Sequence, residues 1–203
     1  LFYIITVTYK ILLHFQEDGV MKKNNSIQTV VAVGIGAALF FVLGRFVAIP
    51  SPVPNTNISL QYAVLALLAA MYGPFAGGLI GFIGHTLIDL SWGGSPWWSW
   101  VIASTFVGIV VGLFAKKLDI QEGDFGKGKI ATFAISNIVA HLAAWIVVAP
   151  VLDILIYAEP ANKVFAQGAF AAVANILTAV IVGILLVIAY TKTIAKKGSL
   201  DQE

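Results

Sequence analysis

The chain has 203 residues, of which 59% are hydrophobic and 11% are charged, and it contains no cysteine. This composition is far more apolar than that of soluble domains, and it excludes a disulfide framework and a thiolate metal site. The net charge of +2 is small and the basic residues are scattered, so nucleic-acid binding is excluded as well. The expected fold is one compact helical bundle in the lipid bilayer, without a separate soluble domain.

The N-terminal residues differ from the rest of the chain. Met21-Lys22-Lys23 has the form of an ordinary translation start, and Gln16-Glu17-Asp18 can be back-translated into a purine-rich ribosome-binding sequence. We therefore expect residues 1–20 to be a non-native or mis-started leader. Residues 21–198 are expected to form the membrane domain, and residues 199–203 a cytoplasmic tail.

Six apolar segments follow, and each predicts a membrane-spanning helix because about 20 apolar residues are needed to cross a bilayer. Tyr72-Gly73-Pro74 separates the second from the third, because glycine and proline end one helix and begin another. The fourth follows the turn Gly93-Gly94-Ser95-Pro96. The sequence predicts an all-α integral membrane bundle of six transmembrane helices, over residues 27–48, 58–73, 74–91, 98–116, 129–149 and 164–191.

Basic residues predict the orientation of this bundle. Ten of the twelve lie before the first span, between the fourth and fifth, or after the sixth. Only Arg45 and Lys163 lie on the opposite side. Because positive residues gather in cytoplasmic loops, both termini are predicted to be cytoplasmic in a multi-pass protein of the bacterial plasma membrane.

Asn137, His141 and Trp145 stand on successive turns of the fifth span, so their side chains share one helix face. Polar groups at this depth usually face a solute cavity. Asparagine and histidine can instead hydrogen-bond a neighbouring helix, and this alternative stays open.

Further polar and aromatic side chains reach the same outer half of the predicted bundle from three other spans. Binding sites typically combine apolar and aromatic walls with a few hydrogen-bonding groups. Tryptophans also gather at membrane interfaces irrespective of function, so the tryptophans keep both interpretations. The residues predicted to join the pocket are Asn175, Gln61, Gln167, Trp97 and Trp98.

The charged residues limit the kind of solute. A phosphate or carboxylate site usually supplies Arg or Lys, but the nearest cation, Arg45, is expected to snorkel to the interface. Asp89, Asp153 and Glu159 are placed at or beyond the outer edge, with Asp89 capping the adjacent loop. The predicted solute is small, flat, heteroaromatic, and neutral or weakly basic.

No motif in the sequence indicates catalysis. The chain lacks a phosphate-binding Gly-x-x-x-x-Gly-Lys loop, a Gly-x-Ser-Gly string and a His-x-x-x-His pair. No enzymatic activity, cofactor or metal is expected, and uphill transport requires a partner that hydrolyses ATP. The alternative is a stand-alone secondary carrier or channel for a small neutral solute.

Residues 21–198 resemble the substrate-binding S components of energy-coupling factor (ECF) vitamin transporters. The likeness lies in the start at Met21, the small-residue first span, and the run 73–81, which continues to Gly84-His85-x-x-x-Asp89. The loop strings 49–55 and 94–100 resemble the subgroup predicted to carry hydroxymethylpyrimidine, a thiamin precursor.

This resemblance implies a subunit that captures solute from outside and docks on a transmembrane coupling subunit carrying two cytoplasmic ATPases. Asn137, His141, Trp145 and Asn175 match the arrangement that holds the ligand in thiamin-binding relatives. The docking face would include small residues of the first span that are four apart. The two candidate pairs are Ala32 with Gly36 and Gly34 with Ala38, and the second is favoured because it ends in alanine.

Overall fold

The computed structural model describes residues 25–200, so the predicted leader and residues 201–203 lie outside the described part of the chain. The fold is all-α, as predicted, apart from one pair of two-residue antiparallel strands. In chain order the elements are α2 (Asn25–Phe46), β1 (Ile49–Pro50), β2 (Asn57–Ile58), α3 (Gln61–Leu90), α4 (Trp98–Leu113), α5 (Ala115–Leu118), η1 (Ile120–Glu122), α6 (Lys127–Leu142), η2 (Ala143–Val148), α7 (Ala149–Tyr157), α8 (Ala161–Leu177), η3 (Thr178–Val182) and α9 (Gly183–Leu200).

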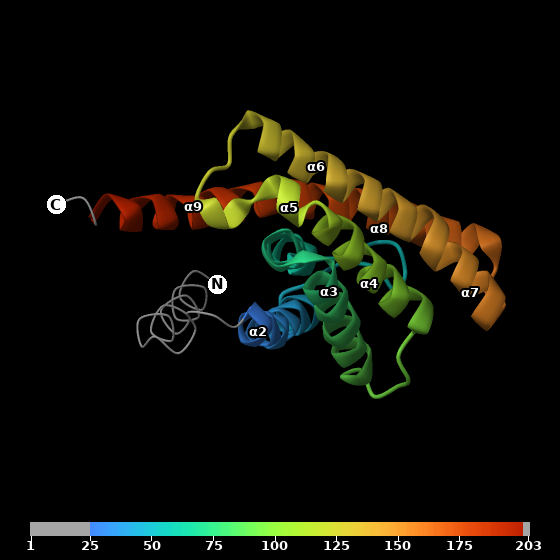
Figure 1. Cartoon of the computed structure of the whole chain (residues 1–203). Helices are drawn as coiled ribbons and strands as arrows, with labels where there is room; N and C mark the ends of the chain where they lie inside the picture. Colours follow the sequence, from blue (N-terminus) through green and yellow to red (C-terminus); the bar gives the residue numbers. More distant parts are fainter. Residues whose placement is uncertain (1–24, 201–203) are drawn as a thin grey trace.

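The helices form two groups (Figure 1). α6, η2 and α7 make one continuous rod, and α8, η3 and α9 make a second rod beside it, while α2, α3 and α4 pack together against them. Within residues 25–200, four stretches are long and apolar enough to cross a membrane: α2, α3 and the two rods. The count rises to five if α4 and the segment 115–122, bent by 42°, form one span.

α3 does not run straight, because its backbone leaves the helical conformation at Gly73, with φ 87° and ψ −176°. A Cβ added to Gly36 of α2 would lie 2.7 Å from Leu68 and 2.6 Å from Ile80. In a straight helix these two residues would be about 18 Å apart, so the two halves of α3 fold back on each other. The break predicted at Tyr72-Gly73-Pro74 is confirmed.

The second half of α3 packs against α4 through glycines. A Cβ added to Gly77 would collide with the carbonyl oxygen of Gly108, and one added to Gly108 would collide with the carbonyl oxygen of Gly77. Small residues permit this close backbone approach between membrane helices. Gly77, Gly78 and Gly81 therefore pack inside the bundle.

The helix predicted to end at Ala149 continues to Tyr157, so that boundary is wrong. Pro150 does not break it, because Pro150 lies in the first turn of α7 directly after the π-helical segment η2. A π segment shifts the hydrogen-bond register by one residue, and the first turn of a helix does not need the proline N–H. The added turns bring Asp153 and Tyr157 onto a helix that faces the bundle.

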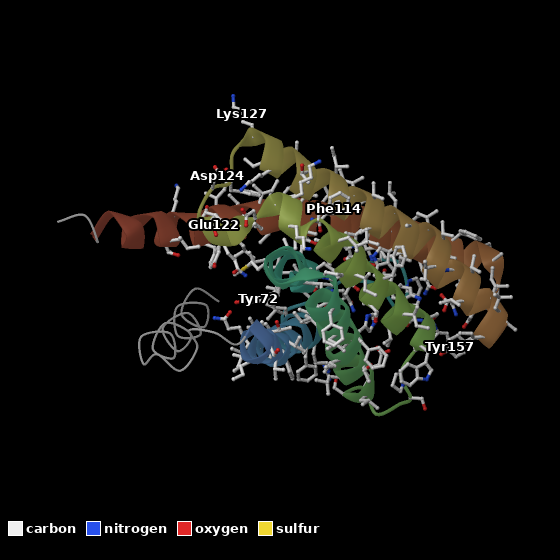
Figure 2. The ribbon with its side chains drawn as sticks, viewed as in Figure 1. Tyr72, Phe114, Glu122, Asp124, Lys127 and Tyr157 are labelled. Atoms are coloured by element: carbon white, nitrogen blue, oxygen red, sulfur yellow. The ribbon has the colours of Figure 1, made fainter. Side chains whose placement is uncertain are left out.

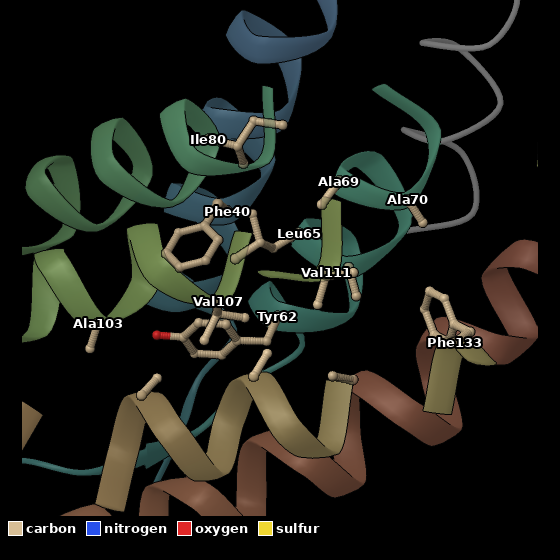
Figure 3. Packing of buried hydrophobic residues seen from close by; sticks show 14 of the residues in the cluster. Phe40, Tyr62, Leu65, Ala69, Ala70, Ile80, Ala103, Val107, Val111 and Phe133 are labelled. Carbon is tan, nitrogen blue, oxygen red and sulfur yellow. The ribbon is translucent and has the colours of Figure 1, made fainter. Parts of the chain in front are cut away.

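The core lies where α2, α3, α4 and α6 meet. Figure 3 shows Phe40, Tyr62, Leu65 and Val107 gathered there, and all four are buried. The outer surface carries large apolar side chains instead, such as Phe75, which is 71% exposed. Exposed apolar groups of this size suit contact with acyl chains.

Candidate solute-binding site

A cavity of about 620 Å³ opens between the β1–β2 loop, α3, the loop before α4, α7 and α8. This volume lies within the range typical of ligand pockets. Its side chains are of four kinds: the aromatic Tyr62, Trp92, Trp97, Trp100 and Trp145; the charged Asp89, Asp153, Glu159 and Lys163; the uncharged polar Asn55, Thr56, Asn57, Ser59, Gln61, His85, Ser95, Gln167 and Asn175; and the aliphatic Ile88, Val164 and Ala171.

The predicted pocket residues divide into two groups. Five line the cavity, and they come from elements far apart in the sequence: Gln61, Trp97, Trp145, Gln167 and Asn175. Three do not line it: Asn137, His141 and Trp98. The predicted convergence of amide and indole side chains is therefore present. Asn137 and His141 of α6 do not take part in it, and neither does Trp98.

His141 and Asn137 lie behind the cavity wall and are fully buried. The indole Nε1–H of Trp145 donates to Nδ1 of His141 over 3.0 Å, and the Tyr62 ring meets the imidazole edge-on at 5.1 Å. Because Nδ1 accepts, Nε2 carries the proton of the neutral ring. Within the described residues, His141 Nε2 and Asn137 Oδ1 have no hydrogen-bond partner. His141 does not line the cavity itself. It hydrogen-bonds the indole of Trp145, which does line the cavity.

Trp98 points away from the cavity. It is 42% exposed, and its ring stacks on Phe82 with centroids 6.2 Å apart. Its backbone N–H donates to the Tyr157 hydroxyl over 2.9 Å. This placement fits the interfacial interpretation of Trp98.

Asp153 is one of the lining residues that the sequence interpretation left out of the pocket. It was placed at or beyond the outer edge of the bundle, but it is only 2% exposed. Its carboxylate accepts from Trp97 Nε1 over 2.6 Å, from Trp100 Nε1 over 2.9 Å and from the Ser99 hydroxyl. A signal was available, since Asp153 follows Trp145 by eight residues and shares its face once the helix continues past Pro150.

A chain of polar groups runs from the cavity floor to the loop before α4. The Ser104 hydroxyl lies 2.7 Å from the Tyr62 hydroxyl and 2.6 Å from His85 Nδ1, and His85 Nε2 lies 3.7 Å from Asp89. Asp89 accepts the backbone N–H of Trp97 over 2.8 Å. Asp89 therefore fixes the loop as expected, at the residue that begins the cavity wall.

The segment between β1 and β2 contributes Asn55 and Thr56 to the cavity lining. Gln167 Nε2 of α8 donates to the carbonyl oxygen of Pro54 over 2.8 Å, which ties the loop to α8. The guanidinium of Arg45 lies 3.8 Å from the centre of the ring of Trp92, which lines the cavity. Arg45 thus rests on an aromatic face, where a cation is attracted by the ring.

The two candidate docking pairs lie on different faces of α2. Ala32 and Gly36 are buried, and Gly36 packs against α3. Gly34 and Ala38 are exposed, and a Cβ added to Gly34 would meet no atom within 4 Å. Only the second pair is free on the surface.

These features agree with a comparison to protein families. The model of the family described as "ECF-type riboflavin transporter, S component" matches residues 24–192. The chain belongs to this family of ECF S components. It is therefore a bacterial membrane protein and the substrate-binding subunit of a transporter, which is not an enzyme.

Similar bacterial proteins cover nearly the whole S component. A UPF0397 protein of Enterococcus faecalis is 50% identical over 183 residues, which cover 90% of this chain and 100% of that protein. A UPF0397 protein of an Exiguobacterium species is 55% identical over 174 residues, covering 86% of this chain and 95% of the relative. A UPF0397 protein of Lactobacillus helveticus is 53% identical over 184 residues, which cover 90% of this chain and 100% of that protein.

Proposed function

We propose that this S component captures a flat heteroaromatic solute, hydroxymethylpyrimidine or a related thiamin precursor, for an ATP-driven importer. The observation that carries the proposal is the cavity, where indole rings from separate helices face amide side chains. Aromatic walls stack on flat rings, and a few placed amides give orientation and specificity. The choice of the pyrimidine rests on the loop strings 49–55 and 94–100.

The proposal includes six membrane passes with both termini in the cytoplasm. The fold-back of α3 at Gly73 supports it, because each half of α3 then counts as one pass beside α2, α4 and the two rods. An even number of passes puts both ends on one side, and the distribution of basic residues favours the cytoplasmic side.

Energy would come from partners. The family implies an ECF module, and we propose that this chain docks through Gly34 and Ala38 on the transmembrane coupling subunit of that module, which carries two cytoplasmic ATPases. The exposure of this pair supports the assignment, because small residues on an open face allow another helix to approach closely. Reorientation of the docked bundle would then release the solute inside.

The solute is tested by calorimetric titration of the purified chain with hydroxymethylpyrimidine, thiamin and riboflavin, the last because it names the family model. Mass spectrometry of co-purified small molecules provides an unbiased check. Uptake that is driven uphill only when the ATPase subunits are co-expressed separates an importer subunit from a stand-alone carrier.

The site is tested with two tryptophan substitutions. Trp145→Ala removes a stacking wall and should weaken solute binding about tenfold or more. Trp98→Ala removes a tryptophan outside the cavity and should leave affinity within about twofold. Equal affinities for the two variants would place the solute elsewhere.

A further inference from the structure

The charged side chains of the cavity are unbalanced. Lys163 is the one lining ammonium group, and its Nζ lies 2.7 Å from Glu159, so these two neutralise each other. Asp89 and Asp153 remain. Among the side chains that the structure describes, those of residues 26–194, neither of them forms an ion pair with a lysine or arginine, and Asp89 is paired only with His85, whose Nε2 lies at 3.7 Å.

Hydrogen bonds satisfy Asp153 without neutralising it. Its partners are two indole N–H groups and one hydroxyl. Indole N–H groups can only donate, so both carboxylate oxygens act as acceptors, as in an ionised carboxylate. Buried charges in proteins are normally paired with an opposite charge. For Asp153, the cavity is the open side from which such a charge can approach.

Asp89 also keeps its negative charge, because its neighbour His85 can be neutral. If Nε2–H faces the carboxylate, Nδ1 accepts from Ser104, and Ser104 in turn accepts from Tyr62. In this arrangement each contact from Tyr62 to Asp89 joins one donor to one acceptor. The imidazole is then neutral and polarises towards Asp89 without cancelling its charge. The Tyr62 oxygen keeps a lone pair for a donor in the cavity.

The aromatic walls of the cavity, like its carboxylates, favour a positively charged ligand. The cavity is lined by Tyr62, Trp97, Trp100 and Trp145, and the faces of such rings attract cations, most strongly those of tryptophan. Trp97 joins both features, because its backbone N–H binds Asp89 and its indole N–H binds Asp153. Aromatic rings and two carboxylates that have no lysine or arginine partner among the described side chains therefore line the same cavity.

From this arrangement we infer that the captured solute is a positively charged heteroaromatic ring. The cation lies against the indole faces, and Asp89 and Asp153 supply its counter-charge. The inference rests on the proposed function and narrows its substrate class from neutral or weakly basic to cationic. A neutral ring of the same shape would leave both carboxylates without a partner.

The test uses two ligands of one shape and different charge. Thiamin carries a permanently positive thiazolium ring, and 3-deazathiamin replaces it with a neutral thiophene. Each is titrated calorimetrically, together with hydroxymethylpyrimidine, into the purified full chain in nanodiscs of zwitterionic lipid. We expect thiamin to bind about tenfold or more tightly than its neutral analogue.

Two variants locate the charge that matters. Asp89→Asn keeps an acceptor for the Trp97 N–H and removes the charge, so it should weaken thiamin about tenfold and leave 3-deazathiamin within about twofold. Glu122→Gln removes the same charge from an exposed residue. Figure 2 shows Glu122 at the opposite end of the molecule from Tyr157, whose ring stacks on Trp97. Glu122→Gln should change neither affinity.

The outcomes separate this inference from the proposed function. Equal binding of thiamin and 3-deazathiamin, or equal losses for both in Asp89→Asn, overturns the cation inference and leaves solute capture intact. If a chain with a sharp thermal unfolding transition binds none of the three ligands, the proposed substrate class fails as well.

Discussion

At the residue scale, Trp145 and His141 occupy one face of one helix and have different positions relative to the cavity. Trp145 lines it, while His141 accepts the indole N–H from behind. The spacing of four predicted the shared face, because it follows from helix geometry alone. It did not predict which side chain reaches the cavity, because that depends on the packing of Tyr62 against both rings.

His141→Phe tests this division. Phenylalanine keeps a ring beside Tyr62 but removes the acceptor of the Trp145 N–H. A buried donor without a partner costs about 1–3 kcal/mol, so the unfolding temperature of the purified chain should fall. Solute affinity should fall a few-fold, by less than in Trp145→Ala.

The control for this substitution is Ile135→Ala, on the exposed face of the same helix. It should change affinity by less than about twofold. If His141→Phe leaves both stability and affinity at the wild-type values, the bond to His141 does not orient the indole.

At the element scale, the sequence predicted helix existence better than helix limits. Gly73 and Pro74 predicted the break in α3 because glycine adopts positive φ freely and proline cannot continue the first helix. The same rule misplaced the end of the fifth span at Pro150, because η2 absorbs the proline. Asp153 was therefore left out of the predicted pocket, although it lines the cavity. A π segment is decided by tertiary packing, for which the sequence carries no local signal.

Gly108→Ala tests the contact between α3 and α4. The added methyl group would collide with the carbonyl oxygen of Gly77, and overpacking of this kind costs about 1–3 kcal/mol. Thermal unfolding in detergent should therefore shift to lower temperature. Gly34→Ala adds the same group into open space and should be neutral or stabilising, because alanine favours a helix by about 1 kcal/mol. Equal unfolding temperatures for the two variants would contradict the close approach.

At the scale of the whole molecule, the protein presents different surfaces to different partners. Apolar side chains such as Phe75 and Leu155 face outward over most of the bundle. The cavity opens at one end, and the exposed pair Gly34 and Ala38 lies on the outer face of α2. The sequence suggested both docking pairs equally by spacing, and burial of Gly36 against α3 distinguishes them.

Gly34→Leu tests the docking face. The larger side chain projects from an open surface, so the isolated chain should fold and bind solute with unchanged affinity. Co-purification with the co-expressed coupling subunit and ATPases should be lost, because leucine prevents close helix approach.

Val42→Leu, on the same exposed side of α2, is the control and should preserve the complex. Retention of the full complex by Gly34→Leu would show that the coupling subunit binds another face.

Trp97 connects helices that the chain order keeps far apart. Its backbone N–H is held by Asp89 of α3 and its indole by Asp153 of α7, and α3 in turn packs against Gly36 of α2. Because Trp97 lines the cavity, we predict that a bound solute shifts this residue between its two anchors. Such a shift would reach α2 through α3, and α2 is the helix that we propose docks on the coupling subunit. The coupling subunit would then meet a different surface on a loaded chain than on an empty one.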